Sequence, residues 1–461
     1  MKVLNKEVFA TKVSIPGIKV PKLEISSSQK TWKPLLFKMR GVKPIGELGD
    51  RDPQKDTHSL VLLDPEKLKA DCLTVAQKEA LQSFGLDFSD VKTYEIELHY
   101  DNWSSSDIFR AVLPSDADNV TSFTQIGHIA HLNLKPETEP YKFLIGEVLL
   151  DKVSSVKTVV NKLGTIDNTY RNFQMELLAG EENYVTQTKE HNCTFELDFS
   201  KVYWNSRLAT EHQRIVEEIE KNSTVYDVFA GIGPFSVPLA KKKNCTVYAN
   251  DLNPHSFEYL NKNMKLNKVN LNRVKTFNLD GRDFIQTIVK QDLVKQIEEQ
   301  YKLDSSKASG TCDVGAAELE LESSDQITTA VKPPSYVVMN LPAIALDFLS
   351  EFNGLLKDLP SHLKLTELIE KVLPVVFCYT FSPKTDMETE LRVRTESSIG
   401  QPLPLTFKSR IVRNVAPNKE MVCVCFKLWP SLVLGEQQLK SDEIGDSKSE
   451  YEPESKKQKI I

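Results

Sequence analysis

An alternation of strands and helices that begins near Thr210 restricts the fold of this chain more than any other feature. Short apolar segments predict strands, and polar segments with helix-like spacing separate them; the strand segments are TVYDVFA, CTVYAN, VKTFNL, YVVMN and VVFCYTF. Strands that alternate with helices form a parallel sheet with crossover helices. The closing segment SRIVRNVAPNKEMVCVCFKLW predicts a β-hairpin around Ala416–Lys419, so we expect an α/β sheet with an antiparallel edge.

The segments before this sheet indicate further domains. Residues 60–92 have helical periodicity, and a β-rich stretch follows to about Phe199. We therefore expect a small N-terminal domain over residues 1–92 and a middle α+β domain over residues 93–205. The α/β domain should then occupy residues 206–430.

The net charge of −6 is unevenly distributed. Segment 302–332 is small, polar and acidic and predicts a disordered insert, and the mixed-charge segment 431–461 predicts a disordered tail. Residues 1–45, in contrast, hold ten Lys or Arg and only two Glu. Most of the excess acidity thus lies in segments that we expect not to fold, and it is no evidence against a nucleic-acid partner.

Composition excludes several classes of protein. No apolar run approaches the ~20 residues that cross a bilayer, so we expect no membrane span. Seven Cys without a C-x-x-C pair argue against a disulfide scaffold or a zinc ribbon and favour a reducing compartment. We also expect no metal site, because the nearest candidates lack the ligand spacing of structural zinc; they are His128, His131, His191 and Cys193.

A glycine-rich turn after the first strand of the α/β domain is the strongest local signal. Glycines at the carboxyl end of a first strand let the backbone approach a ligand closely, and Pro234 suits the first turn of the next helix. Ser236 stands where a dinucleotide fingerprint has its third glycine, which weakens a nicotinamide interpretation. The candidate cofactor-binding residues here are Asp227, Phe229, Ala230, Gly231 and Gly233.

Acidic residues also end the next two strands. Asp251, which precedes Leu252, can accept both ribose hydroxyls of an adenosine, and Asp280, which precedes Gly281, can accept from an adenine amino group. Each aspartate alone is more often a turn former or a helix cap. Three acid-tipped strands in order, beside a glycine-rich turn, fit S-adenosylmethionine better than NAD. The further candidate cofactor-binding residues are Asp251, Leu252, Asp280, Gly281 and Asn340.

The fourth strand ends in Met339-Asn340-Leu-Pro342. Amino-methylating enzymes of this fold have an Asn/Asp-Pro-Pro-aromatic loop there, which presents an amide and carbonyls to a planar nitrogen. Asn340-Leu-Pro342 is a variant of that loop without the aromatic residue. Taken alone, it would be interpreted as a proline-containing strand exit.

Two upstream segments complete a set of five motifs. They are YRNFQMELLAG, residues 170–180, and KVYWNSRLATE, residues 201–211. The set closely resembles the archaeal and eukaryotic tRNA (guanine-N1)-methyltransferases that act on guanosine at tRNA position 37, over about residues 93–430. The resemblance implies a Rossmann-like class I methyltransferase sheet, S-adenosylmethionine as cofactor, tRNA as partner and a monomer. It also implies a role in reading-frame maintenance and in the first step of wybutosine synthesis.

The chemistry explains why this family needs particular residues. Guanine N1 carries a proton, so methylation requires a base for that proton and a donor for the charge that develops on O6. By resemblance Glu211 matches the base and Arg171 the O6 partner, while Asn340 and Pro342 shape the guanine pocket. Without the family, Glu211 would be a first-turn helix acid and Arg171 a surface charge.

The resemblance implies two further contacts with the tRNA substrate. Tyr203 is grouped with the catalytic residues and Arg207 with phosphate contacts, although strand packing and a local ion pair explain them equally well. The target base is stacked in the anticodon loop, so we expect the enzyme to turn it out into the pocket. The basic segment 1–45 suits contact with phosphates, or is a merely soluble face.

The sequence leaves two alternative functions and the cellular location open. A related class on the same fold transfers the aminocarboxypropyl group in wybutosine synthesis, and a tRNA-binding protein with a vestigial site is a third reading. The expected location is the cytoplasm, with the mitochondrial matrix and nucleus as further compartments. The basic segment 1–45 is a weak presequence because Pro16 and Pro21 interrupt it, and the KKQK of the tail is an import patch or solvated charge.

Overall fold

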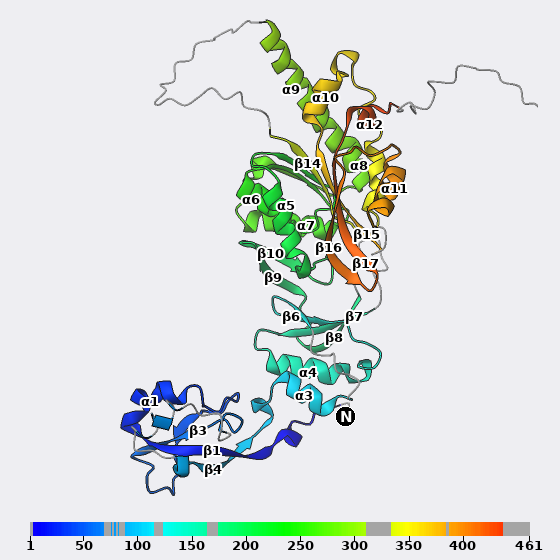
Figure 1. Cartoon of the computed structure of the whole chain (residues 1–461). Helices are drawn as coiled ribbons and strands as arrows, with labels where there is room; N and C mark the ends of the chain where they lie inside the picture. The colour runs from blue at the N-terminus through cyan, green and yellow to red at the C-terminus, as the bar shows by residue number, and fades with distance from the viewer. Residues whose placement is uncertain are drawn as a thin grey trace, which may run out of the picture. The chain divides into compact units, whose positions relative to one another are not determined.

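The computed structural model describes residues 3–68, 75, 78–79, 82, 88–114, 123–163, 174–309, 333–383 and 387–436. The chain divides into two compact units. Unit 1 comprises Met1–Thr188 and Asp198–Ser200, and unit 2 comprises Lys189–Leu197 and Lys201–Ile461. Figure 1 shows the elements of each unit along the chain.

The first sheet of unit 1 has the strand order β2-β3-β1-β4, with β1 Thr11–Pro21, β2 Ile45–Glu47, β3 His58–Leu62 and β4 Lys92–Leu98. The long strand β1 pairs antiparallel with both β3 and β4. Helix α1, Ile25–Trp32, adds Trp32 to a core that also contains Ile18, Val20 and Val61. Part of the basic segment 1–45 is therefore the centre of a folded sheet.

This sheet corrects two expectations. Helical periodicity over residues 60–92 predicts a helix, but β3 occupies the beginning of that range and β4 its end. Positions 75, 78, 79 and 82 are helical, so the prediction is right for the described middle of the range. The boundary at 92/93 is wrong, because β4 belongs to the first sheet.

The second sheet of unit 1 has the order β5-β6-β7-β8, with β5 Thr124–Ile126, β6 Ile129–Leu132, β7 Thr158–Leu163 and β8 Gln174–Gly180. Only the β6–β7 pairing among these described strands is parallel. Helices α3, Ser105–Val112, and α4, Lys142–Lys152, pack on it through buried residues such as Ile108, Phe109 and Val148. A middle region of mixed strands and helices was expected, and this sheet with its two helices has that form.

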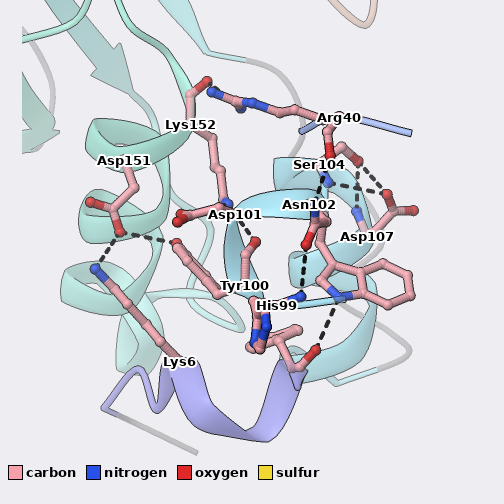
Figure 2. Close-up of polar contacts among 12 residues, drawn as sticks. Lys6, Arg40, His99, Tyr100, Asp101, Asn102, Ser104, Asp107, Asp151 and Lys152 are labelled. Carbon is pink, nitrogen blue, oxygen red and sulfur yellow. Dashed lines mark hydrogen bonds and ion pairs between the residues drawn. The ribbon is translucent and has the colours of Figure 1, made fainter. Parts of the chain in front are cut away.

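A polar cluster connects the early segments of unit 1 to α4 (Figure 2). The Tyr100 hydroxyl donates to Asp151 at 3.1 Å, and Lys6 pairs with the same carboxylate at 2.7 Å. Lys152 Nζ donates to the Tyr100 carbonyl at 2.6 Å and lies 3.7 Å from the centroid of its ring. These bonds fix η1, Lys6–Phe9, and η4, Tyr100–Asn102, against the end of α4.

Strands β9, Val185–Glu190, and β10, Cys193–Asp198, form a two-stranded sheet. Their turn residues His191 and Asn192 both have positive φ, as the tightest hairpin turns require. Two amide side chains also hold β10. Asn263 of α7, Pro254–Leu266, bonds the backbone of Glu196, and Asn267, the C-cap residue of the same helix, bonds that of Thr194. Within unit 2, these side chains bond the backbone of β10 as a neighbouring strand would.

Unit 2 contains the sheet that the strand–helix alternation predicts. Its order is β13-β12-β11-β14-β15-β17-β16, and all the expected apolar segments are strands. β11 to β15 run parallel, and β17 is antiparallel to both β15 and β16, so the expected antiparallel edge is confirmed. The strands are β11 Thr224–Asp227, β12 Thr246–Asn250, β13 Val274–Phe277, β14 Ser335–Met339, β15 Val375–Ser382, β16 Lys408–Ala416 and β17 Lys419–Lys427.

Helices cover this sheet and enclose its core (Figure 1). They are α5 Ala209–Glu218, α6 Ser236–Lys243, α7, α8 Gly281–Phe284, α9 Lys290–Ser309, α10 Thr366–Val372, α11 Met387–Ile399 and α12 Pro430–Leu434, with η6 Ser206–Leu208 and η9 Ala345–Phe352 among the shorter turns. The strand order reverses between β11 and β14, and α/β sheets bind ligands at the carboxyl ends of the strands beside such a reversal.

Three boundaries in unit 2 differ from expectation. Helix α9 continues to Ser309, so the predicted disordered insert is wrong for residues 302–309, and residues 310–332 lie outside the described residues. The predicted tail is wrong at its start, because α12 buries Leu432 and Val433. The unit also begins before residue 206, with Lys189–Leu197 and the segment that starts at Lys201.

Candidate active site

The glycine-rich turn connects β11 to α6 and has the backbone that only glycine adopts freely. Gly231 and Gly233 have φ of 55° and 98°. A Cβ on Gly233 would lie 2.8 Å from a methyl of Val237 and 2.9 Å from one of Leu260, whereas a Cβ on Gly231 would meet no atom within 4 Å. Gly233 therefore permits close helix packing, and Gly231 borders open space that a ligand can enter. Helix α6 begins at Ser236, two residues after the expected start at Pro234.

Asp227, the last residue of β11, lies beneath this turn and is fully buried. Its Oδ2 accepts a hydrogen bond from the Ser236 hydroxyl at 2.6 Å, and Oδ1 has no hydrogen-bond partner among the described residues. Burial raises the pKa of this carboxyl from 3.8 to about 7. The buried side chain thus stabilises the turn through its hydrogen bond to Ser236.

The raised pKa predicts a pH-dependent stability. The folded protein keeps a proton that the unfolded chain releases above pH 4, so this carboxyl's contribution to stability is lost as pH rises from about 4 to about 7, at roughly 1.4 kcal/mol per unit. Asp227→Asn removes the titration and keeps an acceptor for Ser236. We expect the unfolding midpoint of this variant to rise relative to wild type between pH 5 and pH 8, measured by thermal denaturation.

The matched control is Asp101→Asn, because the side chain of Asp101 is 98% exposed. It should follow the wild-type profile at every pH. Equal pH slopes for wild type and Asp227→Asn would show that Asp227 is ionised in the folded protein.

Asp251 follows β12 and holds the glycine turn in place. Its Oδ2 accepts from the Gly231 N–H at 2.8 Å, and its Oδ1 accepts from the Asn253 N–H at 2.9 Å. Burial raises the pKa of this carboxyl to about 6, against the effect of these two hydrogen bonds. The carboxylate therefore lies beside the open face of Gly231, with Leu252 next to it and 41% exposed.

Asp280 and Gly281 lie at the start of α8. Asp280 caps this helix by accepting from the Arg282 N–H at 2.8 Å, and its side chain is 40% exposed. A Cβ on Gly281 would come within 2.9 Å of the Phe229 ring and 3.0 Å of the Phe348 ring. These two rings meet edge to face at 4.9 Å between centroids, and they form an apolar wall beside the polar turn.

The loop after β14 contains an unpaired buried amide oxygen. Oδ1 of Asn340 is buried and has no hydrogen-bond partner among the described residues, and such an atom is costly unless a ligand supplies a donor. Met339 is aligned with Cys378 on β15, so Asn340 is next to Tyr379 in the sheet register. Pro342 lies in the turn that follows.

Glu211 lies in the first turn of α5 and is 7% exposed. Its Oε1 accepts from Arg214 Nη2 at 2.6 Å and from the Tyr379 hydroxyl at 2.8 Å, and its Oε2 accepts from Arg214 Nε at 2.9 Å. The Tyr379 bond brings Glu211 to the strand that borders Asn340. Neither Arg214 nor Tyr379 was among the expected site residues.

The other expected site residues are distributed differently. Tyr203 is 44% exposed and its hydroxyl accepts from Asn205 at 3.3 Å, and Arg207 is exposed. Ala230 is buried, and its N–H donates to the Asn250 carbonyl at 2.7 Å. Arg171 lies outside the described residues.

The described residues contain no group of three or more His, Cys, Asp or Glu that could hold a metal ion. Likewise, no helix in the described part of the chain is long and apolar enough to cross a membrane.

Comparison with known proteins identifies the family. Residues 186–301 match the TRM5/TYW2 methyltransferase domain, and residues 106–183 match the TYW2 N-terminal domain. The chain is 44% identical over 435 residues to the tRNA (guanine(37)-N(1))-methyltransferase of Xenopus tropicalis, covering 94% of this chain and 79% of that protein. It is 40% identical over 461 residues to the enzyme of that name from Mus musculus, covering 100% of this chain and 82% of that protein.

A solved structure has the same fold. The complex of aTrm5 and tRNALeu matches with a TM-score of 0.55 and 22% identity, over 90% of this chain and 99% of that chain. The resemblance inferred from the five motifs is confirmed by the relatives, which match far beyond those motifs. The chain belongs to the tRNA (guanine(37)-N1)-methyltransferase family.

Proposed function

We propose that this protein is an enzyme that transfers the methyl group of S-adenosylmethionine to N1 of guanosine at position 37 of tRNA. One observation carries the proposal. The glycine turn after β11, which Asp251 holds through the Gly231 N–H, lies at the end of the strand next to β14, and the loop after β14 contains the unpaired Asn340 oxygen. The relatives of this chain are named for this reaction. Those relatives are methyltransferases, so they give no support to aminocarboxypropyl transfer.

The residues at the carboxyl edge of the sheet fit the cofactor. The carboxylate of Asp251 would accept the ribose hydroxyls, and Asp280 would accept from the adenine amino group beside the wall of Phe229 and Phe348. The open face of Gly231 leaves room for the ligand backbone. When bound, S-adenosylmethionine supplies a methyl group that its sulfonium makes electrophilic.

The chain's own residues supply the acid–base and binding chemistry. Glu211 would take the N1 proton, and its buried position keeps that proton away from bulk water. Asn340, in a loop shaped by Pro342, would present its amide to the guanine edge. Arg171 would donate to O6, where negative charge develops.

Surface residues would hold the tRNA around this pocket. Tyr203 and Arg207 are exposed close in sequence to α5, which carries Glu211. They would contact the splayed nucleotide and its phosphate. A monomer and a role in the first step of wybutosine synthesis are parts of the same proposal.

The cytoplasm is the proposed location, with the mitochondrial matrix and nucleus as further compartments. β1 begins at Thr11 and buries Ile18 and Val20 in the first sheet. An import signal in this region therefore has to coexist with a folded strand over Thr11–Pro21.

The pKa of Asp251 predicts how cofactor affinity depends on pH. The ionised carboxylate is the acceptor for the ribose, and its pKa is raised to about 6. We therefore expect the dissociation constant for S-adenosylmethionine to be constant above pH 7 and to increase as pH falls through about 6. Calorimetric titrations between pH 5 and pH 8 measure this, and Asp251→Asn should bind weakly with no step at pH 6. A wild-type affinity that is flat over this range would contradict the assignment.

A labelling assay tests the proposed function. The full chain is incubated with methyl-labelled S-adenosylmethionine and unmodified tRNA that carries guanosine at position 37, and the labelled nucleoside is then identified. We expect the label on N1 of that guanosine, and none on a tRNA with adenosine there. Transfer seen only from cofactor labelled in the aminocarboxypropyl group would refute the proposal and support the related class.

A further inference from the structure

We propose that Arg214 and Tyr379 are positioning residues that orient the Glu211 carboxylate and turn one free lone pair of its Oε2 toward the substrate. The inference rests on the proposed function, in which Glu211 is the base. Both residues reach Glu211 through side-chain hydrogen bonds inside unit 2.

The hydrogen bonds leave a single acceptor position on Glu211. A carboxylate has about four lone-pair positions. Among the described residues, Arg214 and Tyr379 occupy both positions on Oε1, and Arg214 occupies one on Oε2. The remaining position on Oε2 is the one from which Glu211 can accept a proton.

The geometry also fixes the direction of that lone pair. The two Arg214 bonds, 2.6 Å and 2.9 Å long, form a parallel fork that sets the plane of the carboxylate. Tyr379 donates from β15, a different element from α5, so the carboxylate is held from two sides. Because these donors are buried or half-buried, they are screened less by water than a surface ion pair.

Charged and titratable groups surround the Glu211 carboxylate. The hydrogen bond with Glu211 raises the pKa of the Arg214 guanidinium, and burial raises the pKa of the Tyr379 phenol well above 10, so the first is a cation and the second a neutral donor. Cys423 of β17 is aligned with Tyr379, and burial likewise raises the pKa of its thiol. Glu218 accepts from the far side of Arg214 and takes part of its charge.

These contacts have a consequence for the reaction that a purely structural ion pair would not have. Arg214 and Tyr379 fix the plane and the direction of the carboxylate that would accept the proton, and a displaced catalytic group reacts more slowly. Loss of either donor should therefore lower the rate of methyl transfer at saturating substrates and leave the binding of both substrates unchanged. A pair that serves only to stabilise α5 would change stability and leave the saturated rate of the folded variant unchanged.

The test compares single-turnover rates of the full-length protein at saturating tRNA and S-adenosylmethionine, beside equilibrium binding of both. For Arg214→Gln we expect the saturated rate to fall by about 10–100-fold, the size of a small misplacement of a catalytic group. For Tyr379→Phe the loss should be smaller, with dissociation constants for both substrates within about threefold of wild type. Arg214→Lys keeps the charge but not the fork, so it should restore only part of the saturated rate.

Arg392→Gln is the matched control, because Arg392 forms a helix ion pair with Glu396 at 3.5 Å elsewhere in unit 2. It should have the wild-type rate. A second readout does not depend on activity: carbon NMR of the Glu carboxyls, with the Glu211 signal assigned by its loss in Glu211→Gln. The chemical shift of the Glu211 carboxyl should change in Tyr379→Phe, because that variant loses the hydrogen bond to Oε1.

The outcomes separate this inference from the proposed function. If Glu211→Gln slows transfer but neither Arg214→Gln nor Tyr379→Phe lowers the saturated rate, the positioning role is wrong and the base role stands. If Glu211→Gln has the wild-type rate, Glu211 is not the base and the positioning role falls with it. Calorimetric binding of S-adenosylmethionine to each variant verifies that the site is folded.

Discussion

Glu211→Gln should slow methyl transfer by about 10²–10⁴-fold, the usual contribution of a general base. The amide keeps the size of the side chain and one acceptor oxygen, which the Tyr379 hydroxyl can still reach. It cannot accept the N1 proton. Affinities for tRNA and S-adenosylmethionine should therefore stay within about threefold of wild type, as measured by equilibrium binding beside single-turnover kinetics.

The control for this variant lies on the same helix. Glu217 is exposed on α5 and its carboxylate accepts from the neighbouring Gln213 side chain, so Glu217→Gln should have the wild-type rate. A rate for Glu211→Gln within threefold of wild type would remove Glu211 from the chemistry. A loss of binding with an unchanged rate at saturation would make it a substrate contact instead.

Asp251→Ala should weaken S-adenosylmethionine binding by about 10²–10⁴-fold. Each hydrogen bond to a charged group contributes about 1.5–3 kcal/mol, and the variant loses both ribose contacts. It also frees the N–H groups of Gly231 and Asn253, which now bond the carboxylate at 2.8 and 2.9 Å. The glycine turn should lose its fixed geometry, which adds to the effect.

Isothermal titration at pH 7.5 measures the affinity, and thermal denaturation checks that the variant is folded. Asp358→Ala is the control, because Asp358 is 68% exposed and pairs with Lys290 at 3.3 Å. It should bind the cofactor like wild type. Cofactor affinity within fivefold of wild type for a folded Asp251→Ala would mean that another group accepts from the ribose.

The parallel strands of unit 2 could be predicted because each is a short apolar run bounded by polar turns. Such strands are buried on both faces, so their apolar character is continuous along the chain. The segment SLVLLDPEKLKADCL was harder, because its apolar residues fit helical spacing as well as a strand. β3 forms there because β1 pairs with it, and that pairing is a tertiary effect.

A tertiary contact also explains why helix α9 extends into the segment 302–309. Its composition, KLDSSKAS, favours a loop. Asp304 lies in that stretch and pairs with Lys371 of α10 at 2.9 Å, so a contact from a distant helix stabilises the additional turns. Composition alone contains no information about such a partner.

Some contacts of the candidate site could likewise be predicted from the sequence, and others could not. The Gly231–Asp251 contact could be anticipated, because the ends of neighbouring parallel strands meet at one edge of the sheet. Arg214 was within reach of sequence reasoning, since residues three apart on a helix face each other. Tyr379 was not, because 168 residues separate it from Glu211 and only the completed sheet brings them together.

The division of the chain into units affects how the protein can be dissected. The sequence leaves unit 1 after Thr188, returns to it for Asp198–Ser200 and leaves it again. Phe199, in the returning stretch, donates its N–H to the Tyr184 carbonyl at 2.9 Å and packs against His131 with ring centroids 5.1 Å apart. A gene fragment that stops at Thr188 would therefore encode unit 1 without one of its core aromatic residues, and a fragment that starts at Lys189 would carry that residue away from its neighbours.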